Sequence, residues 1–204
     1  MNASVPSDAE TAAEEGGDPI YSYKPNLMGS PFVFRLGPTG LAWEYGRRSG
    51  SIGYDQVQRV RISFRPATLQ AQRYLAEIWA PQGPKLQIAS TSFRGLVEQT
   101  RQDAEYTAFV RELHRRLAAA GSAARFEAGM HPMLYWPGAA VFTAIGLAVG
   151  GFLVHTLLNG DWTGAAVVVG VIVLLLWQIG TMFYRNRPLT YRPEAPPGVV
   201  LPRG

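Results

Sequence analysis

Residues 134–158 read LYWPGAAVFTAIGLAVGGFLVHTLL, and residues 162–184 read WTGAAVVVGVIVLLLWQIGTMFY. Neither stretch contains a Lys, Arg, Asp or Glu, and only Asn159, Gly160 and Asp161 separate them. As a helix, each stretch would be about 35 Å long, which is enough to cross a hydrocarbon core of about 30 Å. The pattern therefore predicts an integral membrane protein in which residues 133–185 form an all-α transmembrane helical hairpin.

The positive charges on either side of this hairpin predict its orientation. Arg125 precedes the first apolar stretch, Arg185, Arg187 and Arg192 follow the second, and the connecting turn has no basic residue. Because Lys and Arg accumulate on the cytoplasmic side of membrane helices, both termini are expected in the cytoplasm. The preference for Arg over Lys is typical of a GC-rich bacterial genome, so we expect a multi-pass protein of the bacterial inner (plasma) membrane.

Small and ionisable residues in the first apolar stretch are candidates for helix contacts. Gly146 and Gly150 form a small-xxx-small pair, which lets two helices approach closely. This pair is expected to contact another subunit or the second helix of the same chain, or it simply reflects the high glycine content of membrane helices. His155 lies near the outer end of the stretch, where it is either a functional intramembrane residue or a histidine bonded to the adjacent loop.

Composition divides the rest of the chain into segments. The acids Asp8, Glu10, Glu14, Glu15 and Asp18 occur without Lys or Arg in residues 1–20, so residues 1–30 are expected to be a disordered acidic tail. Residues 31–121 form the predicted cytoplasmic domain, 122–132 a juxtamembrane linker and 186–204 a Pro-rich cytoplasmic tail. The chain has no cysteine, which excludes disulfides and thiolate metal ligands.

The predicted domain begins with alternating apolar and polar residues, the pattern of half-buried strands. Five or six short antiparallel strands are expected, at 32–36, 41–45, around 52–54, and at 60–64, 73–80 and 85–90. The spacing then changes to that of a helix, with one apolar stripe formed by Tyr106, Phe109, Val110, Leu113 and Leu117. Gly121 is suited to end this helix in the left-handed conformation.

This order of elements resembles the pleckstrin-homology-like (PH-like) fold, and more specifically the small bacterial PH-like domains that are joined to membrane helices. The resemblance rests on the opening 32–36 and 41–45 hairpin, the segment 52–57 before an arginine-rich strand, and the closing helix. It implies an α+β domain, with an antiparallel sheet or partly open barrel closed by one C-terminal amphipathic helix. It also implies binding of lipid headgroups or protein segments, without catalysis.

Five arginines are the candidate lipid- or partner-binding residues. Arg59, Arg61 and Arg65 recur on one face of the fourth predicted strand, and Arg47 and Arg48 lie in a preceding turn. Near an anionic membrane surface, each basic residue adds about 1 kcal/mol of attraction. The alternative is an ordinary solvated face opposite the apolar residues of the strand.

Sequence signatures of catalysis and of metal binding are missing. His114, His131 and His155 do not have the spacing of metal ligands, and no nucleophile, phosphate-binding, dinucleotide or nucleic-acid-binding motif occurs. We therefore expect no catalytic residue, metal, cofactor or nucleic-acid partner.

The predicted function is that of a non-catalytic integral membrane protein. It presents a cytoplasmic PH-like module to a protein partner or to anionic lipid, in a scaffold, assembly or regulatory role. The alternative is an accessory subunit or small homo-oligomer of a membrane transport complex, with its function in the helical hairpin.

Overall fold

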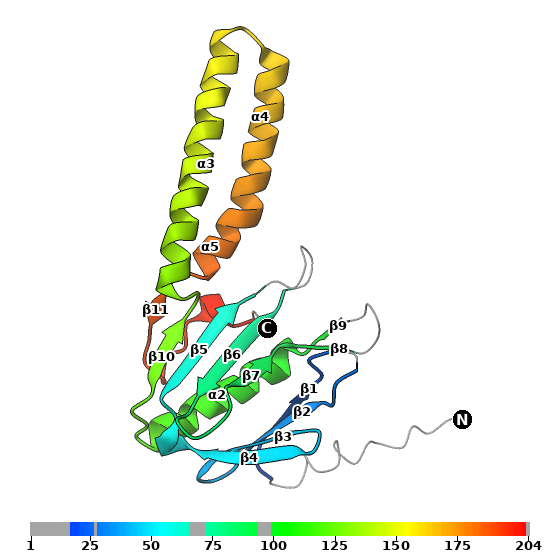
Figure 1. The fold of residues 1–204 in the computed structure, drawn as a ribbon, viewed down its shortest axis with the longest axis vertical. Helices are drawn as coiled ribbons and strands as arrows, with labels where there is room; N and C mark the ends of the chain where they lie inside the picture. The colour runs from blue at the N-terminus through cyan, green and yellow to red at the C-terminus, as the bar shows by residue number, and fades with distance from the viewer. Residues whose placement is uncertain (1–16, 27, 66–71, 94–98, 203–204) are drawn as a thin grey trace, which may run out of the picture. The chain divides into compact units, whose positions relative to one another are not determined.

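The computed structural model describes residues 17–26, 28–65, 72–93 and 99–202. The chain divides into two compact units. One unit combines residues 1–127 with 190–204, and the other consists of residues 128–189. The first unit is α+β, with antiparallel strand pairs and one long helix, and the second is helical (Figure 1).

The first sheet of the α+β unit has four antiparallel strands in chain order: β1 (Ile20–Tyr23), β2 (Phe32–Leu36), β3 (Gly40–Tyr45) and β4 (Arg48–Gly53). Leu36, Leu41 and Ile52 lie side by side across β2, β3 and β4 and are buried. Gly46 begins the tight turn between β3 and β4 with φ +60°, a conformation that disfavours side chains with a Cβ.

A second sheet has the strand order β11 (Leu189–Thr190), β10 (Arg125–Ala128), β5 (Arg59–Phe64), β6 (Tyr74–Trp79) and β7 (Leu86–Ala89). The short 3₁₀ helix η1 (Tyr54–Gln56) connects β4 to β5. A small third sheet pairs β8 (Thr91–Phe93) with β9 (Gln99–Arg101). The two larger sheets meet at β1 and β7, because the Tyr21 and Tyr23 hydroxyls donate hydrogen bonds to the carbonyls of Ala89 and Gln87.

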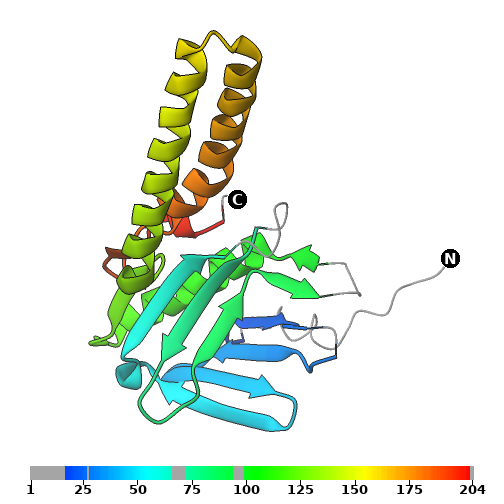
Figure 2. The same cartoon turned by 45° about the horizontal axis from the view of Figure 1, so that its top comes forward.

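The helix α2 (Asp103–Ala119) supplies the rest of the core, and Figures 1 and 2 show it crossing behind β5–β7. All five residues of its expected apolar stripe are buried. Gly121 ends the helix with φ +62°, as predicted from the sequence. The Arg116 guanidinium donates hydrogen bonds to the carbonyls of Leu36 (2.6 Å) and Gly37 (2.7 Å), which fixes the end of α2 to the β2–β3 turn.

All six expected strands are present. The α+β unit, however, extends beyond the expected domain boundaries at residues 31 and 121. β1 lies within the expected disordered tail of residues 1–30, and β10 lies within the expected linker of residues 122–132. The expected Pro-rich tail, 186–204, contains β11 and the 3₁₀ helix η3 (Gly198–Val200). The physical reason is burial: Tyr21, Phe126, Val200 and Leu201 all bury their side chains. Residues 1–16 lie outside the described part of the chain.

The helical unit contains α3 (Pro132–Leu158) and α4 (Trp162–Leu175), which contact each other. A π-helical turn, η2 (Leu176–Gly180), follows α4 and leads directly into α5 (Thr181–Arg185). Within this unit Phe183 stacks on Phe142 (ring centroids 5.5 Å apart) and meets Tyr135 edge-on (5.7 Å). Among the described residues, α3 is the one helix that is long and apolar enough to cross a membrane, and the apolar part of the second helix is shorter.

Candidate functional site

Three of the five candidate arginines lie on the outer face of the second sheet, and each already has a partner. Arg61 on β5 donates from Nε (3.1 Å) and Nη2 (2.5 Å) to one carboxylate oxygen of Glu127 on β10. Arg61 is 9% exposed, so this cation is largely removed from solvent. A buried arginine in an ion pair is not available to a lipid headgroup without losing its partner.

Glu77 on β6 is the centre of a second charged cluster on the same face. Only 1% of this residue is exposed. Its carboxylate lies 2.5 Å from the Lys85 ammonium and 3.5 Å from the Arg65 guanidinium, and it accepts a hydrogen bond from Gln87 (3.2 Å). These contacts compensate the cost of burying the carboxylate, which identifies the cluster as a structural one.

The third arginine, Arg59, has the Trp79 ring as its partner. The Arg59 guanidinium lies 4.0 Å from the centre of the Trp79 ring, within the range of a cation–π contact. Lys85 and Arg61 approach the same ring at 5.0 Å and 5.5 Å. The sheet therefore supplies a partner for each of these three arginines, while the Arg65 side chain is 54% exposed and still meets solvent.

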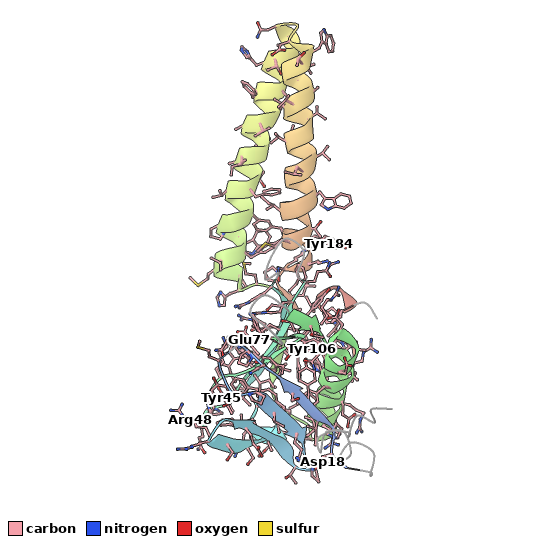
Figure 3. The ribbon with its side chains drawn as sticks, turned by 90° about the vertical axis from the view of Figure 1, so that its right-hand side faces the viewer. Asp18, Tyr45, Arg48, Glu77, Tyr106 and Tyr184 are labelled. Carbon is pink, nitrogen blue, oxygen red and sulfur yellow. The ribbon has the colours of Figure 1, made fainter. Side chains whose placement is uncertain are left out.

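Arg47 and Arg48 lie elsewhere, at the tip of the β3–β4 hairpin in the first sheet, so the structure does not gather the five predicted residues into one site. Both arginines are exposed, and neither has an ion-pair partner among the described residues. Tyr45 lies across from Arg48, and Figure 3 shows the two labelled side chains near the same end of the hairpin. These are the candidate arginines that remain free to bind an anionic group.

Half-buried aromatic rings adjoin this tip. Tyr45 stacks on Phe32 with ring centroids 4.2 Å apart. The Trp43 indole lies against Gly50 on β4, where an added Cβ would approach three ring atoms to 3.0 Å. No sequence signal marks this arrangement, because Phe32, Trp43 and Tyr45 follow the alternation of ordinary core residues. The structure shows that the inner face of the first sheet becomes partly exposed at this end.

In the helical unit, the small-residue pair does not pack against its neighbour. A Cβ added at Gly146 or Gly150 would meet nothing within 4 Å in the described structure, so contact with the chain's own second helix is not what these residues provide. Contact with another subunit stays a prediction. His155 is connected to the turn: the Asn159 amide nitrogen lies 3.2 Å from its Nε2 and donates to its backbone carbonyl at 2.8 Å.

Described residues of the α+β unit line a groove and a smaller hollow. A groove of about 510 Å³ runs between Arg111 and Arg115 of α2 and residues 193–196 of the C-terminal segment. A smaller hollow of about 170 Å³ is lined by residues that include Lys24, Ser92 and Gln102. In the groove the Arg115 cation already pairs with Glu112, and this hydrogen bond lowers the pKa of the Glu112 carboxyl to about 2. Within the described ranges, no group of His, Asp or Glu side chains is arranged to hold a metal ion.

Comparison of the chain with protein-family models, curated proteins and solved structures finds no match. Function is therefore argued from this chain's own surfaces.

Proposed function

We propose that this protein is a membrane-anchored, non-catalytic binding module. In this proposal α3 and the continuous helix α4–η2–α5 cross the bacterial inner membrane as a hairpin. The α+β unit then faces the cytoplasm, where it binds a protein partner in a scaffold, assembly or regulatory role. The proposal keeps the PH-like assignment for this unit, on the basis of the antiparallel β1–β4 sheet, the antiparallel β5–β6–β7 strands of the second sheet and the amphipathic helix α2.

The observation that carries the anchor is the unburied apolar surface of α3. Only 6% of the most apolar 18-residue stretch of α3 is buried. Leu147, Phe152 and Leu158 are each more than half exposed. Water disfavours a continuous apolar surface of this size, whereas a bilayer accommodates it. Trp136, near the start of α3, and Trp162, at the start of α4, are also exposed. Exposed aromatic residues of this kind are expected at membrane interfaces.

Polar groups within the helices support the same interpretation. The hydroxyls of Thr143, Thr156 and Thr181 each donate to a backbone carbonyl one helical turn earlier. Hydrocarbon offers no hydrogen-bond partner, so hydroxyls that bond within their own helix suit a lipid-facing segment. Asp161 is the charged residue in the turn between the helices. Its carboxylate accepts a hydrogen bond from the Gly164 amide (2.8 Å), in the first turn of α4.

Alkaline carbonate extraction of membranes tests this anchor. The full-length chain should stay with the membrane pellet and dissolve only in detergent. Leu147→Arg combined with Phe152→Arg should release it, because each central arginine costs about 2.5–3.5 kcal/mol of insertion free energy. Tyr135→Arg, at the membrane interface, is the matched control and should stay in the pellet. Recovery of the unmodified chain in the carbonate supernatant would exclude the anchor.

A further inference from the structure

The outer edge of β4 has main-chain hydrogen-bonding groups with no partner among the described residues. β4 is the last strand of its sheet and pairs only with β3 in the described structure, as Figure 2 shows. In a hairpin with a two-residue turn, the pair next to the turn, here Tyr45 and Arg48, exchanges both hydrogen bonds. Because the pattern alternates along the strand, the N–H and C=O groups of Ser49 and Ser51 point away from β3.

No backbone hydrogen bond leaves Ser49 or Ser51 toward another described residue. At the opposite edge of the first sheet, the Tyr21 and Tyr23 hydroxyls of β1 donate hydrogen bonds to the carbonyls of Ala89 and Gln87 on β7. Proteins usually protect an open edge with proline, a bulge or an inward-pointing charge. The centre of this edge is instead Ser49-Gly50-Ser51, which is exposed, uncharged and small.

The side chains around this edge favour one kind of occupant. Arg47 and Arg48 provide two exposed cations without acidic partners in the described ranges, and Glu44 lies on the opposite face of the sheet from Arg48. The half-buried rings of Trp43 and Tyr45 lie on the same face as Arg48, next to the side-chain-free position Gly50. An added strand would therefore meet apolar rings and positive charge on the same face.

We propose that the β4 edge binds an extended acidic segment of a partner protein by strand addition. The main chain of the segment forms hydrogen bonds with Ser49 and Ser51, a carboxylate of the segment pairs with Arg47 or Arg48, and an apolar side chain contacts Trp43 and Tyr45. This proposal rests on the proposed function in one respect, that the α+β unit is a binding module. It does not depend on the membrane anchor.

The test uses the full-length chain in nanodiscs of zwitterionic lipid. The probe is a fluorescein-labelled peptide, about seven residues long, of the type Thr-Glu-Thr-Val-Thr-Glu-Thr, in which glutamate and valine lie on the same face of the strand. Fluorescence anisotropy measures its affinity. Methylating alternate backbone nitrogens of the peptide should weaken binding about tenfold or more, because the methyl groups remove the main-chain donors and keep the charge. Replacing the glutamates with lysine should abolish binding.

Substitutions in the protein, in place of changes to the peptide, test the same edge. Ser51→Pro removes one outward N–H without removing a bond to β3, whereas Ser51→Ala keeps it, so only the proline variant should bind weakly. Arg47→Glu with Arg48→Glu should also weaken binding, while Arg111→Glu on α2 should not. Unchanged thermal unfolding of each variant excludes misfolding as the cause.

Three results would overturn the proposal. They are no binding of the unmodified peptide, equal affinity for the N-methylated peptide, and binding of phosphatidylserine vesicles through Arg47 and Arg48 in place of the peptide. A chain that leaves the membrane in carbonate but binds the peptide in this way would overturn the anchor and leave the edge proposal standing.

Discussion

Arg61 on β5 and Glu127 on β10 form an ion pair in which two guanidinium nitrogens share one carboxylate oxygen. Glu127 comes from the stretch expected to be a loose linker before the membrane, yet its neighbours Phe126 and Ala128 are buried. The pair therefore ties β10 into the second sheet and gives Arg61 a structural role, and the lipid contact of this residue stays a prediction.

Removing one member of this pair should destabilise the protein. Arg61→Met leaves the Glu127 carboxylate without its cation, and we expect a loss of about 2–3 kcal/mol of unfolding free energy. Arg111→Met, at an exposed position on α2, should change stability by less than about 0.5 kcal/mol. Thermal unfolding followed by circular dichroism measures both. Equal stability of the two variants would show that the pair contributes nothing.

His114 should make stability depend on pH. Its Nδ1 lies 2.7 Å from the Val110 carbonyl, its Nε2 lies 2.8 Å from the Tyr191 hydroxyl, and burial lowers its pKa below 6.5. Below pH 6.5 the unfolded chain takes up a proton that the folded chain does not, so stability falls as pH decreases from about 6.5 toward the lower folded pKa. The slope is at most about 1.4 kcal/mol per pH unit.

Urea unfolding at several pH values measures this dependence. His114→Phe should flatten the curve between about pH 4.5 and 6.5. If the unmodified chain and His114→Phe lose stability in parallel as pH falls, His114 is not the group responsible.

The end of the chain should contribute to folding. Leu201, in the expected flexible tail, is 3% exposed, and η3 contacts β5. Leu201→Ala should cost about 2–5 kcal/mol, because it removes a buried apolar side chain and leaves a cavity. Leu189→Ala is a matched control, since Leu189 is 44% exposed. Similar melting temperatures for both variants would argue that Leu201 is not part of the core.

Substitutions at two glycines with positive φ distinguish the effect of backbone conformation on stability from the effect of close packing. Gly121 has φ +62° and nothing within 4 Å of an added Cβ, so Gly121→Ala should cost about 1–2 kcal/mol. Gly129 has φ +83°, and its Cβ would collide with the carbonyl oxygens of Asn186 and Arg187. Gly129→Ala should therefore be clearly the more damaging of the two in thermal unfolding. Equal effects would remove the close approach as an explanation.

The sequence predicts the elements that have a regular apolar period. Six strands and α2 follow from alternation and from the i, i+3, i+4 stripe, and Gly121 marks the helix end. The elements that were missed are β1, β8, β9, β10, β11 and η3, because each is at most four residues long and several depend on partners distant in the chain. Tyr21 and Tyr23, for example, are buried through contacts with β7 that no local pattern encodes.

The candidate site was predicted less well than the fold. Arg61 and Arg65 looked like a surface patch, since a single sequence does not show that Glu127 and Glu77 lie next to them. Arg47 was correctly placed in a turn, whereas Arg48 is the first residue of β4. Their separation from the other three arginines depends on the division into two sheets, which local spacing does not reveal.

Cysteine labelling of intact cells tests the central claim most directly, because the chain has no cysteine of its own. A membrane-impermeant maleimide should label Asn159→Cys, in the turn between α3 and α4, from outside the inner membrane of spheroplasts. It should label Ser122→Cys only after the membrane is permeabilised. Labelling of Ser122→Cys in intact spheroplasts, with Asn159→Cys protected, would contradict a double-spanning anchor with both termini in the cytoplasm.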